Sequence, residues 1–110
     1  MNDPDRRGAA IYVDVDDTLV RHARVAPVPV TRVIDQVRRL HARGFLLYCW
    51  STGGAEYARR IATELGVAGC FTAFLPKPTI LIDDQEISAW LLKSFHPSQV
   101  DDASLDAVLP

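Results

Sequence analysis

Three aspartates follow an uncharged, mostly apolar stretch near the start of the chain. Residues 9–13 read AAIYV, and Asp14, Asp16 and Asp17 come within the next four positions. Like charges this close repel one another, and the apolar stretch before them cannot solvate them. The spacing therefore indicates a bound cation, and a set of carboxylate oxygens suits Mg²⁺ better than zinc.

Other polar side chains stand at the ends of apolar stretches later in the chain. Ser51 follows the apolar residues 45–50, and Asp83 closes the apolar residues 79–83. In parallel sheets flanked by helices, functional residues gather beyond the carboxyl ends of the strands. We therefore expect Asp14, Ser51 and Asp83 to meet at one edge of a sheet.

The residues expected at this edge suit a phosphate group. Ser51 and the turn through Thr52 and Gly53 offer a hydroxyl and backbone N–H groups at a helix start, which is a natural anion site. Lys77 adds a positive charge, which phosphate recognition also uses. Magnesium readily takes a phosphate oxygen as a further ligand. Together these groups indicate phosphoryl transfer.

The elements that must position these residues alternate between strand and helix. Strands are predicted over residues 9–13, 45–50, about 70–75, and 79–83. Helices are predicted from a Thr31 N-cap to Gly44, over residues 55–65 ending at Gly66, and over residues 86–93. This alternation predicts an α/β fold: a three-layer Rossmann-like sandwich with a central parallel sheet and helices on both faces.

The composition is that of one globular domain. The chain has 110 residues, of which 48% are hydrophobic and 24% charged, enough for a single core. A net charge of -2 argues against a strongly basic nucleic-acid surface. We expect residues 1–8 to be a loose N-terminal tail and residues 98–110 a C-terminal tail.

The apolar runs and the cysteines of the chain indicate in which compartment the protein is expected. No apolar run approaches ~18 residues and no signal-like segment stands at the start, so we expect no membrane span. Cys49 and Cys70 lie among apolar neighbours, as reduced, buried thiols of a cytoplasmic protein do.

The order of the polar residues resembles that of the haloacid dehalogenase-like (HAD) superfamily of phosphatases. Four motifs of that superfamily match in order: Asp-x-Asp-x-Thr at residues 14–18, a hydroxyl residue at Ser51, a lysine at Lys77, and an acid pair at Asp83 and Asp84. The resemblance covers roughly residues 9–92. The second acid of the first motif, Asp16, favours a phosphatase over a dehalogenase, which generally lacks it.

The resemblance implies a role for each catalytic residue. Asp14 would be the nucleophile that forms an aspartyl-phosphate. Asp16 would be the general acid for the leaving oxygen and then the base for water, with neighbouring acids raising its pKa. Ser51 would hold a phosphoryl oxygen, and Lys77 would neutralise the nucleophile and the phosphate.

The same resemblance implies a cofactor and a substrate-binding set. Mg²⁺ would be held by Asp14, Asp16 through its backbone carbonyl, Asp83 and Asp84. Thr18, Thr52 and Gly53 are the candidate substrate-binding residues. The protein would be an enzyme, a phosphoric monoester hydrolase.

A cap domain, which most members place over the site, has no room here. The stretches 19–31 and 51–77 are too short to hold a folded domain. The site of such a capless protein would be open to a phosphorylated substrate, including a macromolecular one, or covered by another subunit of a homo-oligomer. Whether Arg21, His22 and Arg24 contact substrate stays open.

Two other functions remain as alternatives. A receiver-like signalling domain also combines acids, a hydroxyl and a lysine, but it places its lysine last, whereas this chain ends its series with acids. A catalytically silent HAD-like module that binds phosphate or metal would keep the fold without turnover. Every expected catalytic residue type is present, so the sequence does not favour that alternative.

Overall fold

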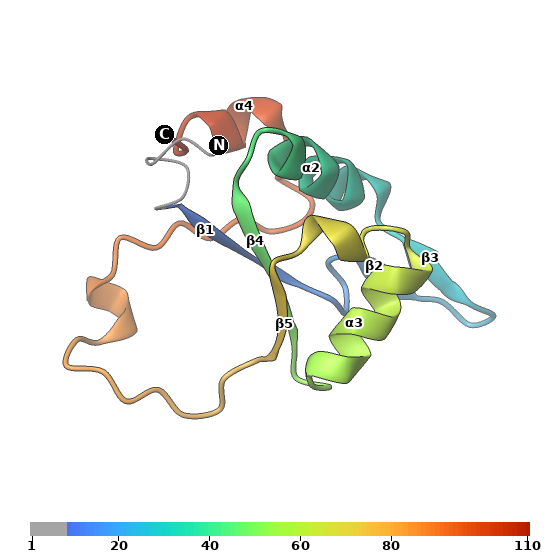
Figure 1. Ribbon diagram of the computed structural model, residues 1–110, viewed down its shortest axis with the longest axis horizontal. Helices are drawn as coiled ribbons and strands as arrows, with labels where there is room; N and C mark the ends of the chain where they lie inside the picture. The colour runs from blue at the N-terminus through green and yellow to red at the C-terminus, as the bar shows by residue number, and fades with distance from the viewer. Residues whose placement is uncertain (1–8) are drawn as a thin grey trace.

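The centre of the fold is a three-stranded parallel sheet. In the computed structural model, which describes residues 9–110, the strands are β1 (Ala10–Asp14), β4 (Leu46–Ser51) and β5 (Ala73–Pro76), in the order β1-β4-β5 (Figure 1). Tyr12 pairs with Tyr48, and Trp50 pairs with Leu75. The first three predicted strands and their parallel pairing are therefore confirmed, each within a few residues. The predicted tail at residues 1–8 lies outside the described residues.

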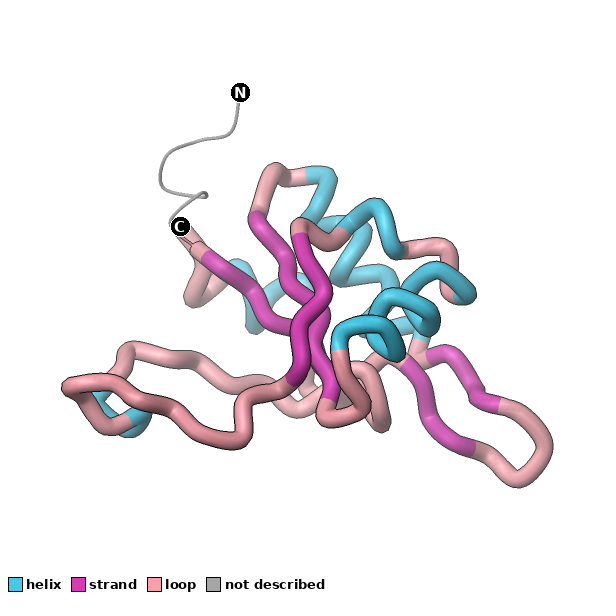
Figure 2. Tube along the Cα trace, turned by 60° about the horizontal axis from the view of Figure 1, so that its bottom comes forward, coloured by secondary structure: helices cyan, strands magenta, loops and turns pink. Residues whose placement is uncertain are grey.

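The remaining elements surround this sheet or extend from it. They are the hairpin β2 (Val20–His22) and β3 (Pro27–Pro29), the helices α2 (Thr31–Ala42), α3 (Ala55–Glu64) and α4 (Asp102–Asp106), and the short 3₁₀ helices η1 (Ala68–Cys70) and η2 (Ile87–Ala89). The hairpin extends outward, as Figure 2 shows.

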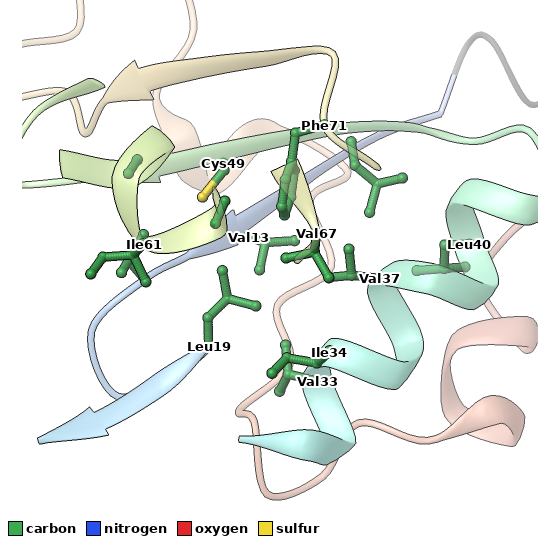
Figure 3. Close-up of a cluster of buried hydrophobic side chains, with 14 of the residues drawn as sticks. Val13, Leu19, Val33, Ile34, Val37, Leu40, Cys49, Ile61, Val67 and Phe71 are labelled. Carbon is green, nitrogen blue, oxygen red and sulfur yellow. The ribbon is translucent and has the colours of Figure 1, made fainter. Parts of the chain in front are cut away.

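Helices α2 and α3 pack on the same face of the sheet. Alternate residues of β4 are buried, among them Leu47 and Cys49, as expected for a strand with one covered face. Helix residues such as Val37 and Ile61 join them in one core cluster (Figure 3). The other face carries three aromatic rings, and the central one, Tyr12, contacts both Tyr48 and Trp50. The tyrosine of β1 is 46% exposed, so helices on both faces are not confirmed.

The predicted ends of both long helices are confirmed, whereas the predicted N-cap is shifted. Gly44 and Gly66 follow α2 and α3 with φ of 88° and 73°, the left-handed conformation that glycine adopts without strain. Thr31 is the first residue of α2, and the N-cap is Val30, whose side chain has no oxygen to accept a capping hydrogen bond.

The predicted strand at residues 79–83 and the predicted helix at residues 86–93 are wrong for this conformation. Residues 77–86 form no strand, and the only helical turn between residues 86 and 93 is η2. These residues belong to a long loop that runs from β5 to α4 and extends away from α3 (Figures 1 and 2). The apolar pattern of residues 79–83 is typical of a strand, but only two residues separate Pro76 from Thr79, and a connection to a further parallel strand needs a dozen residues or more.

The end of the chain is a docked helix and not a tail. Asp101 caps α4 by accepting a hydrogen bond from the Ser104 backbone N–H at 2.7 Å. Asp106 lies 3.0 Å from the Arg39 guanidinium and 2.6 Å from that of Arg43, both on or beside α2. Leu105 is buried, so α4 adds an apolar contact to these ion pairs.

We predict that Leu47→Ala lowers the free energy of unfolding by about 2–5 kcal/mol, because it leaves a cavity under the two helices. Leu47 is 0% exposed, whereas Val25, at the tip of the hairpin, is 98% exposed. Urea unfolding followed by circular dichroism measures the change, and Val25→Ala is the control. Equal effects of the two substitutions would contradict the location of the core.

Candidate functional site

A tight loop after β1 holds the first group of site residues. The backbone N–H groups of Thr18 and Leu19 both donate to the carbonyl of Val15, at 3.2 and 2.9 Å. Val15 and Leu19 are fully buried and anchor the loop to the core. Asp17 takes a φ of 61°, a conformation that aspartate tolerates better than most residues. The loop therefore presents Asp14 and Asp16 at the carboxyl end of β1.

Lys77 and Thr18 contact the two oxygens of the Asp14 carboxylate. The Lys77 ammonium lies 3.8 Å from Oδ1, and the Thr18 hydroxyl donates to Oδ2 at 3.4 Å. The Lys77 backbone N–H donates to the Ser51 carbonyl at 2.9 Å, which continues the pairing of β5 with β4. The side chains of Asp14 and Lys77 are 32% and 41% exposed, so the pair is accessible to a ligand. The structure thus brings Asp14, Thr18 and Lys77 together.

Ser51 lies at the same end of the sheet and is nearly inaccessible. It is 1% exposed, and its hydroxyl accepts a hydrogen bond from the Gly53 N–H at 3.0 Å. A Cβ at Gly53 would lie 2.9 Å from the Tyr57 ring, so this position requires glycine. Thr52 and Gly53 are exposed in the turn that leads into α3. The turn keeps the Ser51 hydroxyl at the base of the site and its own backbone at the surface.

Asp16 makes two hydrogen bonds that sequence reasoning missed. Its Oδ1 accepts from the Tyr57 hydroxyl at 2.7 Å and lies 2.7 Å from the His22 Nε2. The Tyr57 ring packs against the core cluster while its hydroxyl reaches Asp16. Helical side chains tilt toward the helix N-terminus, and Tyr57 stands in the first turn of α3, so its position could have indicated a side chain directed back toward the site.

These hydrogen bonds reverse the expected ionisation of Asp16. Burial raises the pKa of this carboxyl, but hydrogen bonds from His22 and Tyr57, together with the charge of His22, outweigh burial and lower it. The expectation of a raised pKa from neighbouring acids is therefore wrong in this structure. The same contact with Asp16, with burial, raises the pKa of Tyr57 to about 12, so the phenol stays a donor at neutral pH.

Asp83 and Asp84 do not join this group within one chain. Both are exposed, and the Asp83 carboxylate accepts a hydrogen bond from the Gln85 N–H at 2.9 Å, inside its own loop. Residues 9–110 contain no cluster of three or more histidine, cysteine or acidic side chains arranged to hold a metal ion. The predicted meeting of Asp83 with Asp14 is therefore not found in the single chain, because residues 79–83 do not pair beside β1.

The hairpin residues whose contact with substrate the sequence leaves open differ in their surroundings. His22 reaches Asp16, as described above. Arg21 and Arg24 are exposed on the hairpin.

Comparison of the chain with models of known protein families, with curated proteins and with solved structures finds no match. The resemblance to the HAD superfamily thus depends on the motifs alone. Across the described part of the chain, none of the helices has the length and apolar character needed to cross a membrane.

We predict that Tyr57→Phe raises the pKa of Asp16 toward the ordinary value of an aspartate, because it removes one of the two hydrogen bonds to the carboxylate. A pH titration of the Asp16 carboxyl carbon by NMR measures the change, with Tyr12→Phe as the control. A pKa unchanged by Tyr57→Phe would contradict the contact.

The same contact has a consequence for acid stability. Because folding lowers the pKa of Asp16, this carboxylate stabilises the protein above its unfolded-state pKa, and the contribution is lost as the pH falls through the folded-state pKa. Tyr57→Phe should therefore reduce the loss of stability between about pH 5 and 2, as measured by urea unfolding at a series of pH values.

Proposed function

We propose that this protein hydrolyses phosphate monoesters through a phosphoryl group carried transiently on Asp14. The observation that carries the proposal is the Asp14 carboxylate itself: it is partly exposed and has a lysine ammonium on one oxygen and a threonine hydroxyl on the other. A carboxylate held in this way can attack an electrophile, and its positive neighbour can stabilise the charge that develops.

In the first step, an Asp14 oxygen attacks phosphorus. A bond forms between that oxygen and phosphorus while the bond from phosphorus to the leaving oxygen breaks. Lys77 and the N–H groups at the start of α3 would stabilise the phosphoryl oxygens. Thr52 and Gly53 would position them, and the buried Ser51 would hold this turn through its hydrogen bond from the Gly53 N–H. In the second step, water attacks phosphorus and releases phosphate and the free Asp14 carboxylate.

Asp16 would handle the protons in both steps. The leaving oxygen needs a proton in the first step, and the attacking water gives one up in the second. The lowered pKa of Asp16 suits the second step, because a carboxylate accepts the proton. For the first step Asp16 must be protonated, and His22, 2.7 Å away, is the neighbour able to exchange a proton with it.

The proposal includes a magnesium ion, but the residues of one chain do not provide a complete set of ligands for it. Asp14 ends β1 and Asp16 lies in the loop that follows, whereas Asp83 and Asp84 lie in the loop after β5, and the described residues form no three-ligand cluster. A bound magnesium ion would supply charge neutralisation and a further contact to the phosphate. We derive no step through it, since the ligand set is incomplete within the chain.

The remaining features of the proposal concern the family, the substrate and the location. The motifs support a capless HAD-like phosphatase with a Rossmann-like sheet, and the exposure of Asp14 and Lys77 supports an open site that would accept a phosphate on a large substrate. Cys49 and Cys70 are free thiols, which supports a cytoplasmic location.

A catalytically silent module is the second candidate function, and one observation favours it. Asp83 lies in a loop separate from Asp14, so the acid set of the candidate site is incomplete within a single chain. Such a chain would bind a phosphorylated partner without turning it over.

We predict Mg²⁺-dependent hydrolysis of an aryl phosphate, and a loss of about a thousandfold or more in Asp14→Asn because the nucleophile is removed. The matched control is Asp17→Asn. Asp17 is exposed on the same loop with a φ of 61°, which asparagine also tolerates, so this variant should keep its activity.

The assay compares initial rates with Mg²⁺ and with EDTA over a panel of phosphate esters. Wild-type protein that binds phosphate but hydrolyses none of the panel would favour the silent module. Full activity in Asp14→Asn would exclude Asp14 as the nucleophile.

A further inference from the structure

The outer edge of β1 has no strand partner in the described chain. β1 stands at one end of the sheet and pairs with β4 alone. Its outward N–H and C=O groups are therefore available to another strand, and such an edge readily accepts one. The sheet has a second free edge, at β5, but that strand is shorter and ends in Pro76, which has no N–H to donate.

An apolar segment without a partner lies in the same chain. Ile80, Leu81 and Ile82 are 78%, 50% and 95% exposed in the loop that follows β5. Three consecutive apolar residues are typical of a strand that is buried on both faces. Ile87, Leu91 and Leu92 of the same loop are also more than half exposed, at 57%, 96% and 63%. Exposed apolar surface of this kind marks an interaction site.

The segment cannot reach the free edge of its own β1 in parallel orientation. From Pro76 to Thr79 the chain spans at most about 10 Å. A parallel strand beside β1 would have to start at the opposite end of the sheet and three strand spacings away. That point is on the order of 20 Å from the end of β5. The connection between β5 and residue 79 is therefore too short for residues 79–83 to extend the sheet of their own chain.

We propose that two copies of this chain exchange residues 79–83, each copy adding them as a parallel strand to the outer edge of β1 in the other. A second copy carries both the segment and the edge, so the exchange is reciprocal and closes as a two-fold dimer. The apolar residues 80–82 would then lie beside Ile11, Tyr12 and Val13. Residues 87–92 would follow onto the open face that carries Tyr12, Tyr48 and Trp50.

The parallel orientation also has a consequence for the candidate site, which depends on the proposed function. Asp83 ends the segment as Asp14 ends β1, so a parallel alignment brings Asp83 of one copy to the rim that holds Asp14 and Asp16 of the other. The acid set that is incomplete in one chain would be completed by the second. Each site would then contain Asp14 and Lys77 from one copy and Asp83 from its partner.

The dimer is tested independently of activity by sedimentation velocity at micromolar concentrations. We expect wild-type protein to sediment as a dimer and Ile82→Lys to sediment as a folded monomer, because a lysine cannot be buried in the added strand. Ile82 is 95% exposed in the single chain, so this substitution should leave the fold intact. Val25→Lys, at a position 98% exposed on the hairpin, is the matched control and should remain a dimer. A monomeric wild-type protein, or a dimeric Ile82→Lys, would overturn the exchange.

The shared site is tested by co-expressing Asp14→Asn with Asp83→Ala, each inactive alone. In an exchanged heterodimer, one of the two sites combines an intact Asp14 with an intact Asp83. Co-expression should therefore restore about a quarter of wild-type activity, because half of the dimers are mixed and each holds one intact site. A wild-type enzyme whose variants fail to complement would show that each chain completes its own site. If the wild-type protein hydrolyses nothing, the proposed function fails, while sedimentation still decides the exchange.

Discussion

Parallel pairing of β1 and β5 on either side of β4 is the constraint on which the candidate site depends. Because all three strands run in one direction, their carboxyl ends lie on one rim, and residues far apart in the chain meet there. Asp14 closes β1, Ser51 closes β4, and Lys77 follows β5. The contact of 3.8 Å between Lys77 and Asp14 is a direct result of this geometry. An antiparallel β5 would place Lys77 at the other end of the sheet.

The hydrophobic core lies on only one face of the sheet that carries this rim. Helices α2 and α3 cover the face with Leu47 and Cys49, and the buried residues Val15 and Leu19 tie the loop after β1 into the same cluster. Burial also raises the pKa of Cys49 to about 12, with the Asp14 charge adding to the effect, so this thiol is a packing residue and not a nucleophile. The apolar core therefore positions polar groups that are exposed at its edge.

The loop between β5 and α4 shows how chain length limits a fold. Its apolar residues have the pattern of a buried strand, but two residues between Pro76 and Thr79 cannot carry them back across the sheet. The ion pairs of α4 with Arg39 and Arg43 hold the other end of the loop against α2. Both ends are therefore anchored while the apolar middle is exposed, and this arrangement is the basis of the proposed strand exchange between two copies.

Local sequence patterns were enough to predict the elements that bury their own apolar residues. The continuous apolar stretches of β1 and β4, the helical spacing of Val33 and Val37, and the glycines after α2 and α3 each specify local backbone geometry. The candidate residues Asp14, Ser51 and Lys77 could be placed at one rim because parallel connectivity follows from the alternation of strands and helices.

Tertiary structure alone decided which of these groups touch. The hydrogen bonds of Tyr57 and His22 to Asp16 join residues 41 and 6 positions apart, and only the folded chain shows that they form, so the predicted direction of the Asp16 pKa was wrong. The position of Asp83 was also decided in three dimensions. The apolar residues before Asp83 predict a strand. Such a strand pairs only if the chain can reach a free sheet edge, and that distance depends on where β5 ends in space.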